Sequence, residues 1–110
     1  DLVGPAHAHM ILMTGERFDA AEASRVGLIN KVVPADALAG EIVRLTATLA
    51  VNAPLSLYAN KRTVQAVLQD RADRDMGAIN AAMAACFDSA DYQEGRQAFM
   101  AKRKPAFQGR

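Results

Sequence analysis

Apolar residues recur at helical spacing along most of the chain. The clearest stretches are residues 36–51 and 75–87, whose apolar positions are Leu38, Ile42, Leu45 and Leu49 in the first and Met76, Ile79, Met83 and Phe87 in the second. Steps of three and four place these side chains on one side of an α-helix. The pattern predicts two long helices, the first capped by Asp36, and each has an apolar face to cover.

Proline and glycine mark where other helices begin and end. Pro5 and Pro54 fit the first turn of a helix, where a missing N–H does no harm, so helices are predicted to begin there. Gly15 ends the first of them, because a residue without Cβ adopts the left-handed conformation that closes a helix. Negative and positive side chains alternate along residues 70–75, which are expected to form a solvated turn.

The last helix is predicted to begin after a cap at Asp88 or Ser89 and to run to about Arg103, with Pro105 ending it. Gly95 lies inside this helix, where glycine is destabilising by roughly 1 kcal/mol relative to alanine. The expected benefit is the close approach of a neighbouring element.

Residues 14–34 combine a short helix with a short apolar run. Asp19 and Glu22 have the spacing of a capping box, which predicts a helix over residues 20–26 that Gly27 ends. The apolar run that follows consists of Leu28, Ile29, Val32 and Val33. It predicts a short buried strand or an extended connector. The predicted fold is therefore one mainly helical domain with one short strand.

The composition is that of an ordinary globular protein, with 110 residues of which 51% are hydrophobic and 23% charged. A net charge of +1 argues against a nucleic-acid partner. The single cysteine cannot form an internal disulfide, which fits a reducing, cytoplasmic compartment. No apolar run is long enough to cross a bilayer, so no membrane partner is predicted. Because the chain begins with Asp1 rather than methionine, we expect a fragment or a chain whose start is missing.

Three groups of residues carry a resemblance to a known family. They are TGERFDAAEASRVGLINKVVP at residues 14–34, Asn52-Ala53-Pro54 followed by Lys61, and a closing pattern of Asp91, Glu94-Gly95, Ala98-Phe99, Lys102-Arg103-Lys104-Pro105 and Phe107. In this order they resemble the enoyl-CoA hydratase/isomerase family, also called the crotonase family. The resemblance covers nearly the whole chain.

The resemblance implies a place within a larger fold. Residues 1–110 would be the C-terminal helical segment that packs on a catalytic α/β spiral, with the spiral itself absent. It also implies homo-oligomers, trimers or dimers of trimers, and a coenzyme A thioester as substrate, with no covalently bound cofactor. The reaction implied is hydration of a 2-enoyl-CoA in fatty-acid or related acid breakdown, by a lyase or isomerase of the superfamily, with this segment alone inactive.

Two residues are candidates for ligand contact. The resemblance implies that Phe99 and Lys102 occupy positions where the family's last helix reaches toward coenzyme A. The chemistry fits, because an aromatic face stacks on adenine and an ammonium group neutralises phosphate. The alternative is that Phe99 belongs to the core and Lys102 is merely solvated. No catalytic residue is predicted, because none of the glutamates, Glu16, Glu22, Glu41 and Glu94, falls on a family catalytic position. No metal site is predicted either, because His7 and His9, two residues apart, do not share a helical face.

Two other functions remain open at this point. The chain is alternatively a stand-alone helical oligomerisation module without catalytic activity. A small helical nucleic-acid binder that uses the basic residues 102–104 is the third reading, and the near-neutral net charge opposes it.

Overall fold

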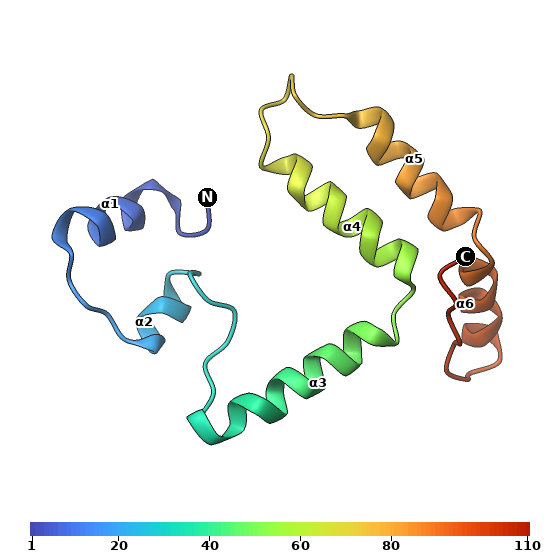
Figure 1. Ribbon diagram of the computed structural model, residues 1–110, viewed down its shortest axis with the longest axis horizontal. Helices are drawn as coiled ribbons and strands as arrows, with labels where there is room; N and C mark the ends of the chain where they lie inside the picture. Colours follow the sequence, from blue (N-terminus) through green and yellow to red (C-terminus); the bar gives the residue numbers. More distant parts are fainter. The chain divides into compact units, whose positions relative to one another are not determined.

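Helices make up all the regular structure of the chain (Figure 1). The computed structural model describes residues 1–110. Its elements are α1 (Gly4–Thr14), α2 (Ala20–Arg25), a 3₁₀ turn (Ala35–Ala37), α3 (Leu38–Ala50), α4 (Pro54–Val67), α5 (Met76–Phe87) and α6 (Ala90–Met100). The prediction of a mainly helical chain is confirmed.

Helix α2 begins and ends as its sequence predicts. The N–H of Glu22 donates to Oδ1 of Asp19 at 2.8 Å, which caps the helix. The other half of the capping box is not used, because the Glu22 carboxylate turns to Arg25 instead. Gly27 follows the helix with a φ of 80°, and Gly15 follows α1 with a φ of 61°.

Of the two forms predicted for the run after Gly27, the strand does not form, and residues 28–34 are a connector. The N–H groups of Leu28 and Ile29 donate back to the carbonyl of Ala23, at 2.9 and 3.4 Å. Those donors close α2 and are not available for a sheet. A strand also needs a second strand beside it, and the chain contains none.

The start of α3 also differs from the prediction. Asp36 does not cap the helix but lies inside the 3₁₀ turn, where the N–H of Ala37 donates to the carbonyl of Pro34 at 3.0 Å. Pro34 is the residue before that turn and has no side-chain donor or acceptor to offer. The helix therefore begins through a tightened turn of backbone hydrogen bonds.

Helices α4 and α5 pack against each other, and α5 also meets α6 (Figure 1). Pro54 is the first residue of α4, as predicted. In the turn between α4 and α5, Arg74 reaches back, donating from Nη2 to the carbonyl of Val67 at 3.1 Å and from Nε to that of Gln69 at 3.2 Å. A residue expected only to be solvated thus satisfies carbonyl groups at the end of α4.

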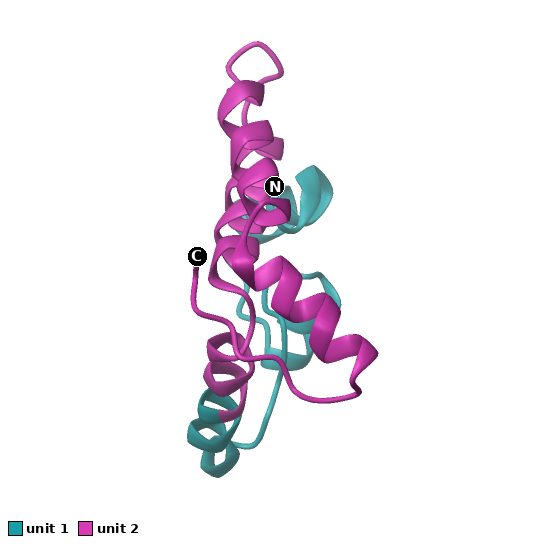
Figure 2. Ribbon diagram, turned by 90° about the vertical axis from the view of Figure 1, so that its right-hand side faces the viewer, with its two compact units in different colours: residues 1–43 teal, residues 44–110 magenta.

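The chain divides within α3 into two compact units, residues 1–43 and 44–110 (Figure 2). Buried hydrophobic residues are all alanines: Ala23 in the first unit and Ala59, Ala66 and Ala98 in the second. No large side chain is fully buried. Both predicted apolar faces remain largely exposed, with Leu45 at 50% and Phe87 at 56%.

No single helix is both long and apolar enough to cross a membrane, although the pair Ala35–Ala50 and Pro54–Val67, bent by 107°, passes that test of length and composition when taken together.

Candidate functional site

The two candidate ligand residues lie at the C-terminal end of α6. The helix ends at Met100, three residues before the predicted end at Arg103, so Lys102 lies in the turn that follows. The N–H of Lys102 donates to the carbonyl of Phe99 at 3.2 Å, and that of Arg103 to the carbonyl of Ala98 at 3.0 Å. This pair of bonds is the Schellman motif, which brings Phe99 and Lys102 together on one turn.

Lys102 adopts a backbone conformation that favours glycine. Its φ is 50°, and it is the only non-glycine residue of the chain with a positive φ. For a residue with a side chain, the left-handed conformation is unfavourable by roughly 1–2 kcal/mol. Strain of this kind gathers at functional sites, where the identity of the side chain matters more than local stability.

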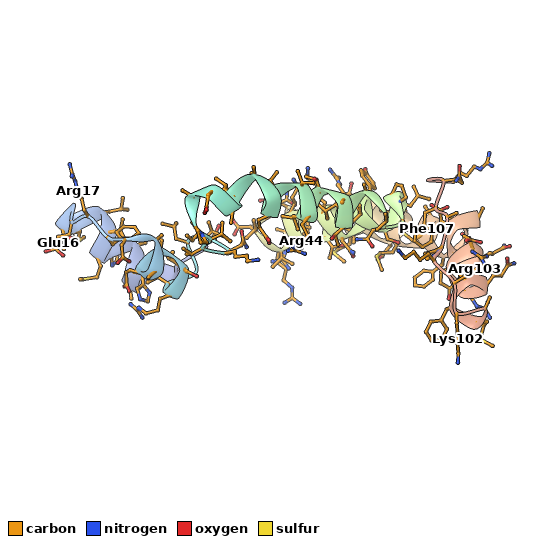
Figure 3. All side chains as sticks on the ribbon, turned by 90° about the horizontal axis from the view of Figure 1, so that it is seen from below. Glu16, Arg17, Arg44, Lys102, Arg103 and Phe107 are labelled. Carbon is orange, nitrogen blue, oxygen red and sulfur yellow. The ribbon has the colours of Figure 1, made fainter.

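Both candidate side chains are exposed. Phe99 is 83% exposed, which does not fit the alternative that it belongs to the core. Lys102 is exposed as well, and Figure 3 shows its side chain extending away from the ribbon. An aromatic face and an ammonium group on one turn suit a ligand that combines a planar ring with a phosphate.

Glu94 ties the turn to the body of α6. Its carboxylate accepts from Nη1 and Nη2 of Arg103, at 2.5 and 2.8 Å, and from the N–H of Ala106 at 2.8 Å. The bond from Arg103, followed by the one from Ala106, lowers the pKa of Glu94 from its ordinary 4.5 to about 2. The carboxylate is therefore charged at any physiological pH, and it holds residues on both sides of Pro105.

Asp91 holds the rest of the C-terminal tail. It is only 2% exposed, and its Oδ1 and Oδ2 accept the N–H groups of Gln108 and Gly109 at 2.7 and 2.8 Å. Its own N–H donates to the carbonyl of Arg110 at 3.1 Å. Asp91 and Glu94 are three residues apart and share one face of α6, along which residues 101–110 run back.

Gly95 lies beneath this tail. A Cβ built on Gly95 would lie 3.5 and 3.7 Å from Cε1 and Cζ of Phe107. The predicted approach of another element to Gly95 is confirmed, but these are ordinary van der Waals distances. The space beside Gly95 therefore does not require glycine.

A groove of about 310 Å³ opens beside Phe99. Its wall includes Leu55, Cys86, Tyr92, Arg96, Phe99 and Phe107. Three aromatic rings and one guanidinium group thus border the hollow next to the Lys102 turn. A planar apolar group is the kind of ligand that such a wall suits.

Three of the four glutamates are engaged in ion pairs. Glu22 binds Arg25, Glu41 binds Lys31 at 2.7 Å, and Glu94 binds Arg103. The hydrogen bonds from Arg25 lower the pKa of Glu22 below its ordinary value. A general acid or base works best with a pKa near the working pH, so lowered carboxyl pKa values are unsuited to that role.

The functional pattern that sequence reasoning missed is the tail clamp of Asp91 and Glu94. In the sequence, both residues stand out only as members of the family's closing pattern. Their spacing signals a shared helical face, but their partners lie nine to eighteen residues away in the chain. Nothing in the local pattern indicates that the tail folds back.

Comparisons with known proteins agree with the sequence motifs. The family model for enoyl-CoA hydratase/isomerase matches residues 1–110. A crotonyl-CoA hydratase of Syntrophomonas wolfei is 35% identical over 106 residues, which cover 96% of this chain and 41% of that protein. A short-chain-enoyl-CoA hydratase of Clostridioides difficile is 33% identical, over 89% of this chain and 63% of its own length.

Solved structures show the same relationship. The structure of an enoyl-CoA hydratase/carnithine racemase from Magnetospirillum magneticum matches with a TM-score of 0.86 and 35% identity, over 99% of this chain and 40% of that one. The chain therefore spans less than two thirds of the length of each of these relatives.

Proposed function

The chain belongs to the enoyl-CoA hydratase/isomerase family, and on that premise we propose that it is the C-terminal helical segment of an enzyme that hydrates 2-enoyl thioesters of coenzyme A. The observation that carries the proposal is a match along the whole chain to proteins named as hydratases, of which it covers only part. In this proposal the segment assembles the enzyme and closes the acyl-CoA site.

The contact with coenzyme A is assigned to Phe99 and Lys102. The Phe99 ring, 83% exposed, stacks on the adenine, and the Lys102 ammonium neutralises a phosphate. The left-handed backbone at Lys102 supports this role, because glycine would be more stable there and would not carry a charge.

The chemical step is assigned to residues outside this segment. Adding water to the double bond places negative charge on the thioester oxygen, which preorganised N–H donors stabilise. The step also needs a carboxylate that exchanges a proton with water near neutral pH. The ion-paired Glu22, Glu41 and Glu94 suit structural roles better.

A second candidate function is a helical oligomerisation module without chemistry. The exposed apolar faces favour it, because Leu38 and Phe87 are 53% and 56% exposed. Exposed apolar surface on this scale usually marks an interface. The two functions are compatible within one longer enzyme.

Hydration of crotonyl-CoA tests the proposal. The complete gene product should hydrate crotonyl-CoA, whereas residues 1–110 alone should show no rate above background. In the complete protein, Phe99→Ala and Lys102→Ala should each raise KM and leave kcat within about two-fold, because the lost contacts lie away from the reacting carbons. Turnover by residues 1–110 alone, or a complete protein inactive on every enoyl thioester, would contradict the assignment.

A further inference from the structure

We propose that Glu94 is a positioning residue that holds Lys102 ready for a phosphate group of the ligand. This inference rests on the proposed contact between Lys102 and coenzyme A. It assigns to Glu94 an effect on ligand affinity, although the carboxylate itself points at Arg103 and Ala106 rather than at a ligand.

The first step is that Lys102 is fixed from both sides. On the helix side, its N–H and that of Arg103 are bound to the carbonyls of Phe99 and Ala98. On the tail side, Glu94 binds the guanidinium group of Arg103 and the N–H of Ala106. Nη1 of Arg103 also donates to the carbonyl of Lys104 at 3.2 Å. The residue in the strained conformation is thus held between a helix end and a clamp.

The second step is that this clamp acts locally. Asp91 binds the N–H groups of Gln108 and Gly109, six and seven residues beyond Lys102, and so anchors the end of the tail. Glu94 binds the residue immediately after Lys102 and one four residues after it. Loss of Glu94 therefore releases the tail side of the Lys102 turn, while the backbone bonds to Phe99 and Ala98 and the Asp91 anchor remain.

The third step concerns charge. Arg103 is engaged with Glu94, so its guanidinium group is neutralised. The side chains of Lys102 and Lys104 remain exposed as cations of the same turn. When a phosphate binds to a turn that is already fixed, no entropy is lost in ordering the turn. This preorganisation increases the affinity for the ligand.

The experiment combines substitution with kinetics on the complete gene product. Glu94→Gln keeps the shape of the side chain and removes the charge that binds Arg103. It should raise KM for crotonyl-CoA roughly three- to ten-fold and leave kcat unchanged, the range expected for losing the order of one such side chain. Arg103→Gln breaks the same pair from the other side and should have the same effect.

A matched control is available in α2. Glu22→Gln removes a carboxylate that is bound by two nitrogens of Arg25, at 2.6 and 2.5 Å, in the same manner. It should leave KM unchanged. A general weakening of the fold would instead raise KM in both variants, and that result would overturn the inference.

The double variant separates this inference from the proposed function. In a Lys102→Ala background, Glu94→Gln should raise KM no further, because the residue that it positions is already gone. Equal effects in both backgrounds, or an unchanged KM in Glu94→Gln beside a raised KM in Lys102→Ala, would overturn the inference alone. An unchanged KM in Lys102→Ala would overturn the coenzyme A contact and the inference with it.

Discussion

Lys102 ends α6 with the same pair of backbone hydrogen bonds with which Gly27 ends α2. Each residue donates to the carbonyl three positions back, at 3.2 and 3.1 Å, and the next residue donates to the carbonyl five positions before it. Their φ angles are 50° and 80°. The left-handed position of the Schellman motif is therefore occupied by lysine at the end of α6 and by glycine at the end of α2.

The difference predicts opposite stability effects. Lys102→Gly should raise the free energy of unfolding by about 0.5–1 kcal/mol. This is the backbone strain that glycine relieves, reduced by the extra conformational freedom that glycine gives to the unfolded chain. Gly27→Ala should lower it by about 1 kcal/mol or more, because alanine is strained at this φ. Urea unfolding followed by circular dichroism measures both. A destabilised Lys102→Gly variant would show that the lysine side chain contributes to folding.

The cap of α2 allows a second prediction. Asp19→Ala should lower the free energy of unfolding by about 0.5–2 kcal/mol, because the N–H of Glu22 loses its acceptor. Asp36→Ala is the matched control, since Asp36 lies in the 3₁₀ turn and does not cap a helix. It should change the free energy of unfolding by less than about 0.5 kcal/mol. Equal effects of the two substitutions would mean that the Asp19 cap adds no stability.

Sequence reasoning succeeds on this chain where a feature depends on residues close together in the chain. The caps at Asp19 and Ser89 and the stop at Gly15 depend on atoms within a few residues, so the residue type predicts them. The apolar run at residues 28–33 predicts a strand or an extended connector, and the choice depends on a partner strand that spacing does not reveal. N–H groups of this run close α2 instead.

The candidate site shows the same division. Phe99 and Lys102 came from the family pattern, and the structure places them on one turn. The sequence does not indicate the left-handed conformation of Lys102, because glycine is the residue type from which that conformation is usually predicted. Gly95 was expected to make room for a neighbour, and Phe107 does lie beside it, but at a distance that would admit a Cβ.

The pKa of Glu94 predicts how stability depends on pH. Its value is about 2 in the folded chain and an ordinary 4.5 without Arg103 and Ala106. A carboxyl group whose pKa is depressed by folding adds stability above the unfolded value, and that stability is lost as pH falls through the folded value. The stability difference between the parent and Glu94→Gln should therefore be constant above pH 4.5 and disappear toward pH 2. Unfolding curves across this pH range measure the stability difference. A difference that stays constant down to pH 2 would contradict the lowered pKa of Glu94 in the folded chain.

The last prediction concerns assembly, which the family resemblance also implies. Met76, Met83 and Phe87 on α5 are 53%, 39% and 56% exposed, and no large side chain of the chain is fully buried. A contiguous exposed apolar patch larger than a few hundred Å² is unusual in a monomer.

Residues 1–110 should therefore self-associate, so that the apolar face of α5 packs against a second copy. Met83→Asp should shift the distribution toward monomer, because a desolvated, unpaired carboxylate is strongly unfavourable. Glu16→Asp, which keeps the charge of an exposed residue, is the control and should leave assembly unchanged. Sedimentation over a wide concentration range measures both. A well-folded parent that is monomeric at every concentration refutes self-association, whereas a Met83→Asp variant that assembles like the parent places the interface on another face, such as that of Leu45 and Leu49 on α3.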